Sequence, residues 1–135
     1  MNTDIVGVWS VEALFKMGSQ SDEILVFNQD GTGWLERINY QEWSADFFYW
    51  QPTSSGWMVI EWTKHIEPHK YTRKIIESAS VQGIVHTSVD VKEEYTPSGL
   101  RMKVLHIRMS DDDYKVYGLV CSAPQTRIGP TGQIT

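Results

Sequence analysis

Short segments of alternating apolar and polar residues, separated by turn-forming residues, run along almost the whole chain. The predicted strands cover residues 7–15, 23–28, 32–39, 44–51, 57–64, 71–78, 83–95, 100–109 and 114–121. No segment keeps the period of a helix for more than a turn or two. Strands repeated every ~8 to 12 residues with turn signals between them are typical of all-β barrels and sandwiches. We therefore expect an antiparallel up-and-down β-barrel of 8–10 strands with little helix.

The 135 residues fit one domain, because a chain of this size can bury one substantial core. Residues 1–135 contain no internal repeat and no linker. Pro and Gly are spaced through residues 122–135, which we expect to form an irregular tail.

The stretch "VFNQDGTGWLE", residues 26–36, reads as the tip of a β-hairpin. Asp30-Gly31 can supply the positive φ that a hairpin turn with a right-handed twist needs. We expect Gly33 to let the following strand bend, with Trp34 filling the space beside it. Neither a lysine nor a helix start follows Gly33, so the stretch is not a phosphate-binding loop.

Apolar residues lie on both faces of two predicted strands. In "WMVIEW", residues 57–62, and in "DFFYW", residues 46–50, odd and even positions are both apolar or aromatic. A sheet with one face in water shows a clean alternation instead. We expect a terminal segment, a helix or a second subunit to cover the outer face, and the sequence leaves internal cover and a homodimer equally open.

Charge and cysteine content narrow the possible partners. The net charge is −5 without any run of Lys or Arg, which argues against nucleic-acid binding. No apolar segment reaches the ~18 residues of a membrane span, so no membrane association is expected. The start lacks a signal-peptide pattern, and the single cysteine, Cys121, cannot form an internal disulfide. We expect a cytoplasmic protein.

Three segments resemble the lipocalin-like part of the calycin superfamily: "IVGVWSVE" (5–12), "ILVFNQDGTG" (24–33) and "SGWMVIEW" (55–62). The pattern covers residues 5–121, and the motifs cover the first sixty. These small antiparallel barrels begin with a Gly-x-Trp, which Gly7 and Trp9 match. The resemblance implies that Trp9 closes the narrow end of the barrel and that an arginine packs over its ring. Arg127 has the best position for this arginine, and Arg108 is the alternative.

The histidines do not form a recognisable metal site. In "HIEPH", residues 65–69, two histidines would share a face only on a helix, and Pro68 opposes helical geometry. His86 and His106 lie on the arms of a predicted hairpin around "TPSG". Paired residue numbers there should sum to 195, which places His106 opposite Val89. We expect no metal and no cofactor.

No set of residues stands out as catalytic. Cys121 has no helix N-terminus or basic neighbour to lower its pKa, and "DDD", residues 111–113, lacks the spacing of a calcium loop. An enzyme in the barrel mouth, with a Tyr, Glu and Arg set acting on an anionic substrate, is the least expected function.

A barrel of about eight strands encloses room for side chains or for one small ligand. We expect non-enzymatic binding of a small, largely apolar ligand in the lumen, and a lumen filled by side chains is the alternative. Arg37 is a further residue that could orient a polar end of the ligand. A second possible function is an inhibitor or immunity-type module that meets a basic partner through the outer wall or rim. The lumen candidates are Trp34, Glu36, Phe47, Tyr49, Trp57, Glu61, Arg73, Arg101 and His106.

Overall fold

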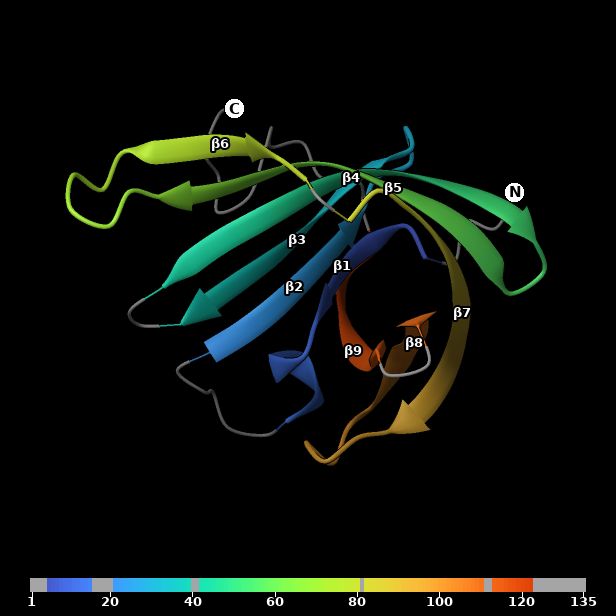
Figure 1. The fold of residues 1–135 in the computed structure, drawn as a ribbon. Helices are drawn as coiled ribbons and strands as arrows, with labels where there is room; N and C mark the ends of the chain where they lie inside the picture. Colours follow the sequence, from blue (N-terminus) through green and yellow to red (C-terminus); the bar gives the residue numbers. More distant parts are fainter. Residues whose placement is uncertain (1–4, 16–20, 40–41, 81, 111–112, 123–135) are drawn as a thin grey trace.

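The computed structural model describes residues 5–15, 21–39, 42–80, 82–110 and 113–122. One short 3-10 helix, η1 (Glu12–Leu14), accompanies the strands in this part of the chain (Figure 1). The strands are β1 (Gly7–Ser10), β2 (Ser21–Phe27), β3 (Thr32–Asn39), β4 (Trp43–Ser54), β5 (Trp57–Pro68), β6 (Ile75–Ala79), β7 (Ile84–Tyr95), β8 (Arg101–Ser110) and β9 (Asp113–Cys121).

The strands form a closed antiparallel barrel, which confirms the predicted fold class. The order in the sheet is β4-β3-β2-β1-β9-β8-β7-β5-β6, and a further pairing of β4 with β5 closes a barrel of eight strands. In β5, residues 57–61 pair with β7 and residues 64–68 pair with β6. The β5–β6 hairpin therefore projects beyond the barrel (Figure 1).

The first predicted strand, 7–15, is shorter in the structure because polar groups start a turn after Ser10. The Ser10 hydroxyl accepts a hydrogen bond from the Ala13 N–H at 3.3 Å, and the Asp22 carboxylate accepts one from the Glu12 N–H at 3.0 Å. These bonds satisfy backbone donors at the start of η1.

Strand β5 continues through Pro68, beyond the predicted end of this strand at residue 64. Pairing between β4 and β5 ends at Ala45 and Ile66. Pro68 lies beyond that point, so its missing N–H removes no bond to β4. The turn that follows falls at residues 69–74, and the predicted strand 71–78 begins only at Ile75.

Two hairpins use the same three-residue loop. In β2–β3 the Asn28 N–H donates to the Thr32 carbonyl and Gly31 has a φ of +90°. In β7–β8 the Thr96 N–H donates to the Leu100 carbonyl and Gly99 has a φ of +84°. A residue in the left-handed region after a type I turn is common in such loops.

The odd loop length corrects the predicted register of the β7–β8 hairpin. Paired residue numbers sum to 196 instead of 195, so His106 lies opposite Asp90 and not opposite Val89. The prediction assumed a turn centred on two residues, whereas three residues form this loop.

Gly33 makes room for a ring from the next strand, and not for Trp34 as predicted. A Cβ at residue 33 would lie 2.5 Å from the Phe48 ring and 2.3 Å from the Val26 carbonyl oxygen. Trp34 points to the opposite face of β3, because neighbouring residues of a strand alternate.

Trp9 is fully buried, as predicted, and its indole Nε1–H donates to the Ile5 carbonyl oxygen at 2.8 Å. A Cβ at Gly7 would lie 2.6 Å from the Cys121 carbonyl oxygen, so a side chain there would crowd β9. The Arg108 guanidinium lies over the Tyr114 ring, 5.1 Å from its centroid, and not over Trp9. Arg127 lies outside the described residues.

Part of the outer face of β2–β5 is buried within the single chain. Val26, Trp34, Ala45 and Ile66 alternate with inward-facing residues, yet each is at most 5% exposed. These four residues are therefore buried without a second subunit, whereas Tyr49 and Trp57 on the same face are exposed.

Candidate functional site

Charged side chains enter one end of the barrel, where β2, β3, β4, β5 and β9 come together. Glu23 pairs with Arg37, and Asp46 pairs with His65. These residues alternate with outward-facing neighbours and so share the inward face with the buried Leu35. We call this group the polar cluster; its members are Glu23, Arg37, Asp46, His65, Lys115 and Tyr117.

Asp46 holds the centre of the polar cluster. Its Oδ2 lies 2.8 Å from Arg37 Nη1 and its Oδ1 lies 2.9 Å from His65 Nδ1. The Asp46 side chain is 7% exposed, whereas that of Arg37 is 50% exposed. On its other side, His65 Nε2 lies 3.8 Å from Glu67 Oε1. One buried carboxylate therefore orients a guanidinium and an imidazole at the open end.

Tyr117 and Glu23 form the deeper part of the polar cluster. The Tyr117 hydroxyl donates to Glu23 Oε1 at 3.0 Å, and Lys115 Nζ lies 3.6 Å from the other carboxylate oxygen. Burial, together with the nearby Glu23 carboxylate, raises the pKa of Tyr117 far above its usual range. The Tyr117 phenol therefore stays protonated at neutral pH and remains a hydrogen-bond donor.

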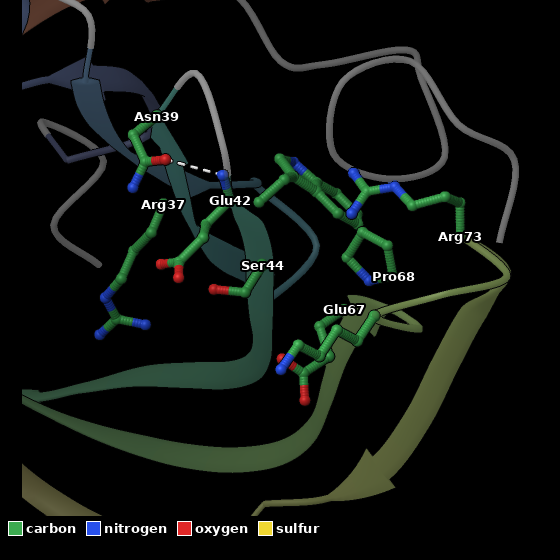
Figure 2. A pocket seen from close by; sticks show the side chains of 9 residues that line it. Arg37, Asn39, Glu42, Ser44, Glu67, Pro68 and Arg73 are labelled. Carbon is green, nitrogen blue, oxygen red and sulfur yellow. Dashed lines mark hydrogen bonds between the residues drawn. The ribbon is translucent and has the colours of Figure 1, made fainter.

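A pocket of about 750 Å³ opens beside the polar cluster (Figure 2). It lies where β4 and β5 separate, beyond the last pairing of Ala45 with Ile66. We call it the mouth pocket; its walls are Arg37, Asn39, Glu42, Trp43, Ser44, Glu67, Pro68, Lys70 and Arg73. Arg37 belongs to both the polar cluster and the mouth pocket.

Hydrogen bonds from backbone N–H groups to side chains hold residues on two sides of the mouth pocket. Between β3 and β4, the Asn39 Oδ1 accepts a hydrogen bond from the Glu42 N–H at 2.7 Å, as Figure 2 shows. Between β5 and β6, His69 Nδ1 accepts the N–H groups of Tyr71 and Thr72, each at 3.2 Å. Glu42 and the start of the turn after His69 are thus each held by a nearby side chain.

Arg73 reaches the mouth pocket from the β5–β6 turn with an unusual backbone. Its φ is +61°, in the left-handed region that costs a residue with a Cβ roughly 1–2 kcal/mol. Gly or Asn would fit this position with less strain. The turn nevertheless presents a long cation there, and Figure 2 shows the Arg73 guanidinium directed toward the mouth pocket.

The side chains that line the mouth pocket suit an anionic ligand that also carries hydroxyl or amino groups. Three cations line it, Arg37, Lys70 and Arg73, against two carboxylates, Glu42 and Glu67. Guanidinium groups bind carboxylate and phosphate through paired, charge-assisted hydrogen bonds. The two carboxylates could accept hydrogen bonds from hydroxyl or amino groups on the same ligand.

The structure places most lumen candidates on the outer face, which contradicts their predicted orientation. The inward side chains of β4 and β5 include Phe48, Trp50, Met58, Ile60 and Trp62, so the odd positions from 47 to 61 face outward. The candidates on the outer face are Trp34, Glu36, Phe47, Tyr49, Trp57 and Glu61. Both faces of these strands are apolar, and the residues predicted to line the lumen belong to the outer face.

Three of these outward residues have close partners. The Trp34 and Phe47 rings pack together with centroids 6.3 Å apart. Glu36, only 3% exposed, accepts a hydrogen bond from the Trp43 indole at 2.7 Å. Glu36 therefore anchors a wall of the mouth pocket from the outside of the barrel.

The remaining lumen candidates are scattered. Arg101 is exposed and pairs with Glu93 at 3.2 Å. His106 lies outside the barrel between Tyr114 and Glu94, with its Nε2 2.5 Å from the Glu94 carboxylate. Of the residues predicted to meet a ligand, Arg37 and Arg73 line the mouth pocket.

The residues that make the open end polar, chiefly Asp46, His65 and Tyr117, were not predicted from the sequence. One signal was available: Asp46 is a charged residue at the start of the apolar run 45–50. Burying a charged side chain among apolar residues costs free energy unless the charge is paired and hydrogen-bonded. Its partners could not be named, because they lie on other strands.

Comparisons with family models, curated proteins and solved structures gave no significant match to this chain. Within the described residues, no helix has the length and apolar character needed to cross a membrane.

Proposed function

We propose that this chain is a non-enzymatic binding protein for a small organic anion, held in the mouth pocket. The observation that carries this proposal is the presence of three cations, Arg37, Lys70 and Arg73, in the lining of one pocket, although the whole chain has a net charge of −5. Cations gathered in a cleft of an acidic protein create a local field that favours anions.

Arg37 is the residue best prepared to bind a ligand. One of its nitrogens is held by the buried Asp46, and its side chain is half exposed. A guanidinium has five N–H donors, so donors remain for a ligand. Because Asp46 fixes the side chain beforehand, less conformational entropy is lost on binding.

The fitting ligand combines an acidic group with an apolar part. Arg37 and Arg73 suit a carboxylate or phosphate, and the Trp43 ring and Pro68 offer apolar contact. Glu42 and Glu67 favour a ligand that also carries a hydroxyl or amino group. We therefore favour small hydroxy acids, amino acids and phosphate esters over neutral lipids.

A largely apolar ligand inside the barrel is the second candidate, and two buried atoms favour it. Among the described residues, Trp62 Nε1 and Thr87 Oγ1 have no hydrogen-bond partner. Both side chains face inward, and a polar atom of a ligand or a water molecule would satisfy them. Against this, the inward rings pack closely, with Phe48 and Trp62 centroids 5.1 Å apart.

We also propose that the chain is related to the calycin superfamily. A closed antiparallel barrel and a fully buried Trp9 after Gly7 support it. An inhibitor or immunity-type role stays a prediction; the exposed Tyr49, Trp57 and Ile84 on the outer wall would serve it.

Calorimetric titration with a panel of anions tests the proposed function. The panel contains inorganic phosphate, a sugar phosphate, hydroxy acids, amino acids and short aliphatic carboxylates. Replacing Arg37 or Arg73 by Gln should weaken the tightest interaction roughly tenfold or more, since hydrogen bonds to charged groups contribute about 1.5–3 kcal/mol. Arg101→Gln is the matched control, because this exposed arginine lies outside the mouth pocket. If all three variants bound the anion as tightly as the wild type, the result would contradict the proposal.

A further inference from the structure

Strand β6 leaves one edge of the sheet open. Among the described strands it pairs only with β5, through residues 64–68. All five of its residues are exposed, and Ile75 and Ile76 are 44% and 43% exposed. The segment has no proline and a single charge, Glu77, so it lacks the usual protection of an edge strand.

The hydrogen bonds to β5 determine which backbone groups of β6 point outward. The His69 N–H donates to the Lys74 carbonyl, and the Ser80 N–H donates to the Thr63 carbonyl. Residues 74, 76, 78 and 80 therefore bond toward β5. Because bonding direction alternates along an antiparallel strand, the N–H and C=O groups of residues 75, 77 and 79 face the open edge.

We propose that this edge pairs with β6 of a second copy of the chain, antiparallel and around a two-fold axis at Ile76. This goes beyond the proposed ligand binding and does not depend on it. In this register Ile76 lies opposite Ile76 of the second copy. The outward groups of Ile75 and Glu77 exchange hydrogen bonds with Glu77 and Ile75 of that copy.

Charge distinguishes this register from its competitor. A two-fold register centred on Glu77 would pair the outward groups of residues 75, 77 and 79, but it would place two carboxylates directly opposite each other. Like charges at such positions are destabilising. With Ile76 on the axis, each Glu77 instead lies opposite Ile75 of the other copy, and Lys74 lies opposite Ser78, one residue from Glu77.

The same charges favour a second copy over an unrelated extended peptide. Two basic residues, Arg73 and Lys74, precede the isoleucine pair, and the acidic Glu77 follows it. An antiparallel copy brings the basic start of one strand beside the acidic part of the other. The edge is therefore complementary to itself in both charge and apolar contact.

Disulfide trapping tests the register directly, in a Cys121→Ser background that removes the native thiol. At residues opposite each other without mutual hydrogen bonds, Cα atoms lie about 4.5 Å apart, a distance that a disulfide can span. Ile76→Cys should therefore form a covalent dimer under mild oxidation. Ile75→Cys is the matched control, because its counterpart in the second copy is only a diagonal neighbour, about 7–8 Å away.

Dimer formed by Ile76→Cys at least tenfold faster than by Ile75→Cys would support the proposal. Equal rates would indicate random collision, and no dimer in either variant would indicate an edge left to solvent or to another protein; both results overturn it. Sedimentation equilibrium adds a readout without cysteine. Wild-type protein should show a concentration-dependent dimer that Ile76→Lys loses, and a wild type that stays monomeric throughout would also overturn the proposal.

Discussion

The imidazole Nδ1 of His65 lies 2.9 Å from Oδ1 of Asp46, whose other oxygen is bound by Arg37. One buried carboxylate thus joins β3, β4 and β5 at the end of the barrel where β4 and β5 begin to separate. This arrangement stabilises the open end and also holds a cation at the wall of the mouth pocket.

Replacing Asp46 by Ala should lower the free energy of unfolding by about 1–3 kcal/mol, because Arg37 and His65 lose their shared partner. Asp90→Ala is the matched control, since Asp90 and its partner Lys92 are both more than half exposed. Surface pairs of this kind contribute about 0–1 kcal/mol. Urea midpoints for the two variants give the comparison, and a loss for Asp46→Ala no larger than that for Asp90→Ala would refute the central role of Asp46.

Trp9→Ala should cost roughly 3–5 kcal/mol, because it removes a fully buried ring from the packed core. Trp57, which is 49% exposed, provides the control for loss of a tryptophan as such. Its replacement by Ala should cost under about 1 kcal/mol, as expected for a surface position. Thermal or urea denaturation measures both, and similar midpoints for the two variants would mean that Trp9 does not close the core.

Stability should fall in alkaline solution through Tyr117. Its folded pKa is raised above the unfolded value of about 10, so the folded state retains a proton that the unfolded state releases. The contribution of the protonated Tyr117 to the free energy of unfolding is fully present below pH ~10. It is lost as the pH rises above this value, by up to about 1.4 kcal/mol per pH unit.

Tyr117→Phe separates this effect from other titrating groups. The variant should be less stable at pH 7, because the hydrogen bond to Glu23 is lost, yet its stability should fall less steeply above pH 10. Urea unfolding at pH values from 7 to 11 measures both slopes. Parallel curves for the variant and the wild type would show that Tyr117 ionises without cost in the folded state.

Strands and turns could be predicted from the sequence because their signals are local. The Asp30-Gly31 turn and the alternation of 57–62 each depend on a few neighbouring residues. The lining of the lumen could not be predicted, because both faces of β4 and β5 are apolar. In addition, the pairing of β4 with β5 shifts between Phe47 and Phe48, which changes which residues of β5 face inward. No residue type in the sequence predicts this shift.

The polar cluster could not be predicted from the sequence, for a different reason. Tyr117 and Glu23 are 94 residues apart in the chain, and they meet only because β9 and β2 both pair with β1. Likewise, the mouth pocket needs the ends of two hairpins to lie side by side. Such juxtapositions follow from barrel closure, which the sequence pattern predicts only as a fold class.

The location of the bound anion is the most direct test of the proposed function. Trp43 lines the mouth pocket and Trp62 faces the lumen, so their indole Nε1–H signals in a ¹⁵N-correlated NMR spectrum report on the two places separately. Trp43→Phe and Trp62→Phe spectra assign the two signals. On titration with the tightest anion of the panel, the Trp43 signal should shift in a saturable way while the Trp62 signal stays in place. A shift of Trp62 with Trp43 unchanged would place the ligand in the lumen, and it would contradict binding at the mouth pocket.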